Sequence, residues 1–124
     1  MPNQTRNQQY AAKVFNHVMT VPPLERDKYT TMAHKLPILI RTAGLAQALA
    51  FVNTTKEHAH ERLLDHLAET VGAGSRENLL DRIRLDELPK YIRLTQETLA
   101  ALLWYKRFAQ SWPEAPAGNQ GVPQ

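Results

Sequence analysis

The sequence predicts an all-α protein, a compact bundle of five to six helices in a single domain. Apolar residues recur three and four positions apart in several segments, which is the spacing of one helix face. The chain has only five glycines and no alternating apolar run bounded by turn signals, so nothing favours a sheet. A length of 124 residues is that of one domain. We place the bundle in residues 1–112.

The first two helices are predicted near residues 5–19 and 23–43. Thr5 is a suitable N-cap for the first, and Pro23 can open the second at its first position. The apolar stripe of the second helix stays in phase across Pro37, so we expect a kink or a short break there and not a long loop. The two stripes contain Tyr10, Ala11, Val14, Phe15 and Val18, and then Tyr29, Met32, Ala33, Leu36, Leu39, Ile40 and Ala43.

The middle of the chain is punctuated by glycines. Gly44 precedes an apolar segment, residues 45–52, that is predicted to be the buried middle of the bundle. Thr55 is the expected N-cap of a further helix that ends at Gly72. Ser75 can then cap a short helix.

The last helix is predicted to begin between residues 86 and 95, because Pro89 is tolerated only near a helix start. Residues 95–109 place apolar side chains on almost every side of that helix. A helix of this kind is buried in a core or against another protein, and a 14.1 kDa chain has little interior to surround it. We therefore expect a partner to complete part of the core. Residues 113–124 are rich in Pro, Gly and Gln and are predicted to be disordered.

Composition narrows the class of protein. The formal net charge is +3 and the sequence pI is near 9.4, which permits nucleic-acid binding without requiring it. The absence of cysteine excludes disulfides and thiol chemistry. The polar N-terminus shows no signal peptide, and no apolar run approaches the ~20 residues of a membrane span. A cytoplasmic protein without membrane contact is expected.

One pair of residues resembles part of a metal site. Glu57 and His60 form a Glu-x-x-His pair, which di-iron bundles use twice on two different helices. No second copy occurs, and His60 falls in the apolar stripe of its helix. We expect a partly buried histidine with a hydrogen-bond partner, and no metal, cofactor or catalytic residues. A stand-alone metal-dependent nuclease that uses these two residues is the alternative, and an unrelated helical adaptor is another.

The same helix carries an acidic ridge. Its members lie four residues apart, so they share one side of the helix: Glu57, Glu61, Asp65 and Glu69. The ridge is interpreted either as a solvated face, relieved by the adjacent Arg62 and His66, or as a docking edge for a basic surface, including another copy of this protein.

Basic residues gather on two other segments. Lys28, Lys35 and Arg41 lie on the second helix, where the exposed aliphatic side chain of Ile38 would indicate an interaction surface. Lys106 and Arg107 interrupt the apolar last helix. Each cation alone is interpreted as a solubilising charge, and the set is interpreted either as RNA-backbone contacts or as subunit contacts.

An ordered set of residues in the second and last helices resembles a known family, the small all-helical subunit of the type III-B CRISPR–Cas RNA-silencing effector, the Cmr complex. The resemblance covers roughly residues 10–112 and is specific as a set, not in any single piece. The set consists of Tyr29, Leu36-Pro37, Leu39-Ile40, Gly44-Leu45 and Gln47-Ala48-Leu49-Ala50-Phe51, followed by Tyr91, Leu94-Thr95, Glu97, Leu99, Trp104 and Lys106-Arg107-Phe108-Ala109.

The resemblance implies a non-catalytic subunit that stacks as a short filament and helps to position target RNA against the guide RNA, while other subunits cleave. The implied partners are the other Cmr subunits, especially the guide-binding backbone subunit, further copies of this chain and the guide RNA–target RNA duplex. The expected RNA-binding residues are Lys28, Lys35, Arg41, Lys106 and Arg107. The expected subunit-contact residues are Ile38, Glu57, Glu61, Asp65 and Glu69.

Overall fold

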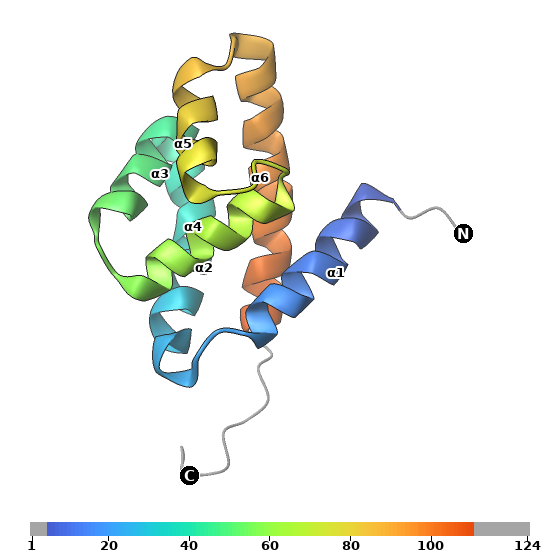
Figure 1. Ribbon diagram of the computed structural model, residues 1–124, viewed down its shortest axis with the longest axis vertical. Coiled ribbons are helices and arrows are strands. Elements are labelled where there is room, and N and C mark those ends of the chain that lie inside the picture. Colours follow the sequence, from blue (N-terminus) through green and yellow to red (C-terminus); the bar gives the residue numbers. More distant parts are fainter. Residues whose placement is uncertain (1–4, 111–124) are drawn as a thin grey trace.

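The computed structural model describes residues 5–110, and it confirms the all-α prediction (Figure 1). Within that range there are six α-helices, one 3-10 turn and no strand. The elements are α1 (Arg6–Met19), η1 (Pro23–Glu25), α2 (Arg26–Ala43), α3 (Leu45–Thr54), α4 (His58–Thr70), α5 (Arg76–Leu85) and α6 (Leu88–Ala109). The predicted tail, residues 113–124, lies outside the described residues.

Local chemistry sets most of the helix ends as predicted. The backbone N–H of Gln8 donates to the Thr5 hydroxyl (3.1 Å), and the backbone N–H of Thr5 donates to the Gln8 side chain (2.8 Å), which completes a capping box. The Ser75 hydroxyl also caps its helix, α5, by accepting from the backbone N–H of Asn78. Gly44 joins α2 to α3 with φ 89°, a left-handed conformation that disfavours any side chain.

The prediction for Thr55 was wrong, because this residue ends α3 and does not begin α4. Its hydroxyl donates to the carbonyl of Val52 (2.9 Å), so it is engaged by the last turn of α3. Lys56 then adopts φ 59°, and α4 begins after Glu57, which makes no side-chain capping bond.

The structure also decides between a kink and a break at Pro37. The helix α2 continues through the proline as one element of 18 residues, so no break occurs there.

The long helix α6 organises the bundle. It packs against α1 and α2 along much of its length and also contacts α4 and α5, and Figure 1 shows α1 beside its C-terminal half. Its inner face is buried at Leu94, Ala101, Leu102 and Tyr105, whereas Leu103 on the outer face is 47% exposed. The protein therefore keeps apolar surface that its own core does not cover. None of the helices among residues 5–110 is long and apolar enough to cross a membrane.

Two predicted apolar segments are buried on one side only. In α3, Leu45, Leu49 and Val52 enter the core, but Phe51 is 48% exposed, so α3 is not the buried middle of the bundle. In α1, Phe15 was assigned to the buried stripe and is 47% exposed. Both errors have the same cause, since each helix has neighbours on only one side.

A hydrogen-bond network, partly buried, connects α1, α4 and α6. The Tyr105 hydroxyl lies 2.8 Å from the Thr70 hydroxyl and 2.7 Å from Nδ1 of His17, and Nε2 of His17 lies 2.7 Å from the Glu69 carboxylate. Because a carboxylate only accepts, Nε2 of His17 is the donor, and neutral His17 then accepts from Tyr105 at Nδ1. His66 stacks on His17 with ring centroids 4.5 Å apart.

Candidate functional site

The exposed face of α2 carries four of the residues that the sequence singled out: Lys28, Lys35, Ile38 and Arg41. Ile38 is 61% exposed, although the opposite face of the same helix is fully buried. Among the described residues, neither Lys35 nor Arg41 has an ion-pair partner. This face thus offers an aliphatic side chain between two cations that the fold itself does not use.

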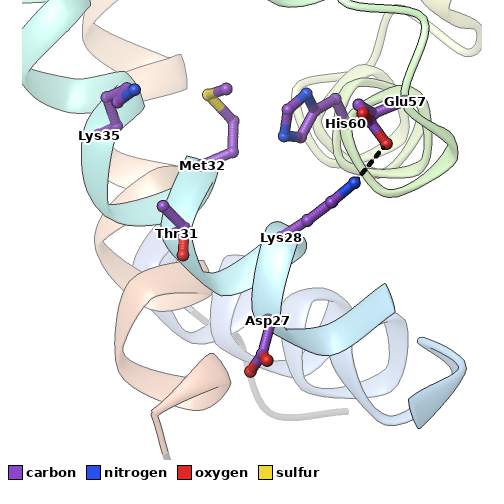
Figure 2. A pocket seen from close by; sticks show the side chains of 7 residues that line it. All are labelled: Asp27, Lys28, Thr31, Met32, Lys35, Glu57 and His60. Atoms are coloured by element: carbon purple, nitrogen blue, oxygen red, sulfur yellow. Dashed lines mark hydrogen bonds and ion pairs between the residues drawn. The ribbon is translucent and has the colours of Figure 1, made fainter. Parts of the chain in front are cut away.

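A pocket of about 250 Å³ opens between α2 and the start of α4 (Figure 2). Its walls include Lys28, Thr31, Met32 and Lys35 from α2 and Glu57 and His60 from the other side, with the His60 ring facing Met32. Nζ of Lys28 donates to the Glu57 carboxylate at 2.9 Å, and this hydrogen bond lowers the pKa of Glu57. The structure therefore pairs a predicted RNA-binding residue with a predicted subunit-contact residue.

His60 has the hydrogen-bond partner that its place in the sequence predicts. Its Nδ1 lies 2.7 Å from the Thr55 hydroxyl, whose single proton is already donated to Val52. Nδ1 must therefore be the donor, so the neutral ring keeps its lone pair on Nε2. Burial lowers the pKa of His60, which favours this neutral form. No group of three or more potential metal ligands gathers among residues 5–110.

Every carboxylate of the acidic ridge has a basic partner in the same chain. Glu57 holds Lys28, Glu69 holds His17, and Arg76 of α5 lies 3.5 Å from Glu61 and 3.6 Å from Asp65. The ridge remains partly exposed, since the four side chains are 35–61% accessible.

The residues expected to relieve the ridge have other partners. Arg62 donates two hydrogen bonds to Glu25, at 2.7 and 3.2 Å, and this contact lowers the pKa of Glu25. His66 is directed into the core, where the Tyr29 hydroxyl lies 2.7 Å from its Nδ1. Sequence spacing could not assign these partners, because they come from other helices.

The other predicted basic pair, Lys106 and Arg107, lies at the far end of the bundle from Arg41. Tyr29 and Tyr105 lie together with ring centroids 6.4 Å apart, so the end of α6 is beside the start of α2. Arg41 is at the other end of α2, about 18 Å further along the helix at 1.5 Å per residue. Arg41 is consequently well separated from Lys106 and Arg107 along the bundle.

The partly buried aromatic residues beside Arg107 were not predicted as a site from the sequence. The Arg107 guanidinium lies over the Trp104 ring, 5.6 Å from its centroid, and Phe108 stacks on the same ring. Phe15 of α1 meets Phe108 edge to face, with centroids 5.5 Å apart. The sequence feature that could have identified this site is the charge pattern, because no acidic residue occurs in α1 or in α6 after Glu97.

Comparison with known proteins gives concordant matches. Residues 6–112 match the family described as CRISPR-associated protein (Cas_Cmr5). A curated relative, the CRISPR system Cmr subunit Cmr5 of Thermus thermophilus, is 45% identical over 109 residues, which cover 87% of this chain and 96% of the relative. The crystal structure of a CRISPR-associated Cmr5 family protein from Thermus thermophilus superposes with a TM-score of 0.82 at 44% identity, over 87% of this chain and 96% of that one.

Proposed function

The chain belongs to the Cmr5 family of CRISPR-associated proteins, and from this premise we propose that it acts as the non-catalytic small subunit of a type III-B (Cmr) effector complex. In this role, copies of the chain stack as a short filament along the guide-binding backbone subunits. They help to hold target RNA against the guide RNA, and other subunits cleave it.

The exposed face of α2 is the observation that carries the proposal. The inner residues of α2 are explained by their burial in the core. Ile38, in contrast, is 61% exposed and lies between two cations that have no ion-pair partner among residues 5–110, so this face has no evident structural role in the isolated fold. Such a face suits contact with a subunit through Ile38 and contact with a phosphate backbone through Lys35 and Arg41. Guide–target pairing supplies sequence specificity in RNA-guided effectors, so charge and shape are sufficient here.

The acidic ridge is a second, weaker docking edge in this proposal. Its carboxylates already have partners in Lys28, His17 and Arg76. Exposed ion pairs contribute about 0–1 kcal/mol each, so the ridge would orient a neighbouring copy and would not hold it alone. Opposed faces that bind head to tail extend into a filament when the rotation does not close.

No observation favours the alternative of a stand-alone nuclease. Glu57 is engaged by Lys28, His60 is anchored by Thr55, and no further metal-ligand group joins them among residues 5–110.

A charge-removal experiment on the assembled complex tests the proposal. Lys35→Gln with Arg41→Gln should lower the slope of log affinity for target RNA against log salt by about 0.7–0.9 for each phosphate that the protein no longer neutralises. The matched control is Arg82→Gln with Arg84→Gln, which removes the same charge from residues that form ion pairs with Asp86 and Asp81. Lys106→Gln with Arg107→Gln then tests the second basic group.

Equal slopes in the test and control variants would overturn the RNA-contact part of the proposal. Affinity purification of the complex followed by native mass spectrometry tests the subunit part. Ile38→Ser should reduce the number of copies per complex without changing the circular dichroism of the free protein. Full copy number in that variant would show that α2 is not the docking face.

A further inference from the structure

An aromatic strip runs across the junction of α1 and α6, and we call it the aromatic seam: Phe15, Phe108 and Trp104. Its rings are in continuous contact, edge to face between the two phenylalanines and stacked between Phe108 and Trp104 with an interplanar angle of 23°. The indole N–H of Trp104 donates to the Asn7 side chain at 3.4 Å, which fixes the indole from the other side. The seam is therefore an ordered surface.

The seam is accessible as well as ordered. Phe15 is 47% exposed, and Trp104 and Phe108 are half-buried. Partly exposed rings that are held by their neighbours provide a surface for stacking, whereas a ring with many rotamers would lose entropy on binding.

The charge around the seam is of one sign. No acidic residue occurs in α1, nor in α6 after Glu97, and Glu97 itself is paired with Arg6 at 3.3 Å. Arg93 and Arg107 are both exposed on the side of α6 that carries Trp104, fourteen residues apart in the sequence and so about 21 Å apart along the helix. A polyanion, and not a basic or neutral partner, complements such a surface.

We propose that the aromatic seam binds unpaired, single-stranded RNA by base stacking, while Arg93 and Arg107 contact its phosphates. Aromatic faces next to basic side chains are the arrangement by which proteins hold single strands without reading their sequence. In duplex RNA the base faces are covered by their neighbours, so the seam discriminates against paired RNA. The inference rests on the proposed function only in that the effector complex brings RNA to this chain.

Two matched phenylalanines allow a controlled test. Phe15 on the seam and Phe51 on α3 are 47% and 48% exposed, so Phe51→Ala removes an equal side chain from a surface away from the seam arginines. With the full-length protein and a short fluorescein-labelled oligouridylate, Phe15→Ala should weaken binding at least about fivefold, the lower end of the stacking range. The salt slope should not change because no charge is removed, and Phe15→Tyr should bind like the wild type.

Duplex RNA of the same length is the second ligand, and none of these phenylalanine variants should alter its affinity. A direct readout uses Trp112→Phe, which leaves Trp104 as the single tryptophan. Its fluorescence should be quenched by the oligouridylate and not by the duplex. This measurement needs no substitution in the seam, so it remains decisive if Phe15→Ala fails to fold.

Equal single-strand affinities in Phe15→Ala and Phe51→Ala, or Trp104 fluorescence that does not respond to the oligouridylate, would overturn the proposal. If Phe15→Ala leaves RNA affinity unchanged but lowers the copies per complex, the seam holds a protein subunit and the inference is wrong. The proposed function would survive that result, since it fails only if the α2 variants leave both RNA binding and copy number unchanged.

Discussion

The acidic ridge on α4 and the aromatic seam between α1 and α6 are both exposed, but they differ in where their polar groups are satisfied. Each ridge carboxylate has a basic side chain of the same protein within 3.6 Å, and Glu69 is connected through His17 to the buried hydroxyl of Tyr105. The two helices of the seam carry basic residues but no acidic residue in α1 and none in α6 after Glu97, and Glu97 is paired with Arg6.

The difference shows that a charge pattern on one helix does not reveal whether those charges are paired within the protein or can contact a binding partner. In the sequence, the ridge is the more conspicuous feature, since four like charges recur at helical spacing. In the fold, the ridge carboxylates are engaged by side chains of the same protein, whereas the less conspicuous seam is the surface that we propose binds RNA. Substitutions on the inner end of the ridge should therefore change stability, and substitutions on the seam should change binding.

The largest effect is expected at the buried end of the ridge. Tyr105→Phe removes the hydroxyl that serves both His17 and Thr70, and it should lower the free energy of unfolding by about 1–3 kcal/mol because two polar groups lose their partner. Urea denaturation measures the change. Tyr91→Phe is the control, since its hydroxyl accepts from the backbone of Ala46 at an exposed site and its loss should cost less. Equal losses in the two variants would mean that the buried hydrogen bonds of Tyr105 stabilise the fold no more than the exposed one of Tyr91.

A pH-dependent effect on stability should follow from His66, which stacks on His17 beside the hydrogen bonds of Tyr105. Burial, and secondarily the neighbouring His17, lowers the pKa of His66 to about 3, whereas the unfolded chain titrates near 6.5. The unfolded state therefore binds the extra proton between these values. The stabilisation is complete above pH 6.5 and is lost as the pH falls toward 3, by at most about 1.4 kcal/mol per pH unit.

Urea denaturation between pH 6.5 and 5 covers this titration above the range in which Glu25 ionises, because the pKa of that carboxyl is lowered from 4.5. His60, whose pKa is also lowered by burial, contributes with the same sign, so the effect of His66 is the difference between the protein and a His66 variant. His66→Asn should flatten the pH dependence there. An unchanged slope in the variant would assign the titration to another group.

The smallest effect on stability is expected at the outer ridge. Glu61→Gln with Asp65→Asn breaks only the contacts to Arg76, and exposed ion pairs contribute about 0–1 kcal/mol each. The reversed variant, Glu61→Lys with Asp65→Lys, should still fold and should reduce the copies per complex in native mass spectrometry. Full incorporation of the reversed variant would show that the ridge is a solvated face. Of the two surfaces, only the seam would then remain as a proposed binding surface.

Sequence by itself determined the features that depend on a few consecutive residues. The N-caps at Thr5 and Ser75, the glycine joint at Gly44 and the buried stripe of α2 from Tyr29 to Ile40 were predicted correctly. Ala43, assigned to the end of that stripe, is exposed. Each depends on backbone hydrogen bonds or on helical spacing within one or two turns, so no distant residue is needed to specify it. The family resemblance drew on the same segments and was confirmed by the comparisons.

The tertiary structure alone decided which apolar faces are covered and which charges are paired. Phe15, Phe51 and Leu103 stay exposed because none of the described helices covers these positions of α1, α3 and α6. Arg76 and not Arg62 serves the outer ridge, because the two glycines after α4 return the chain so that α5 lies against it. Burial and ion pairing depend on side chains that are distant in the sequence, and a helix carries no local record of what packs beside it.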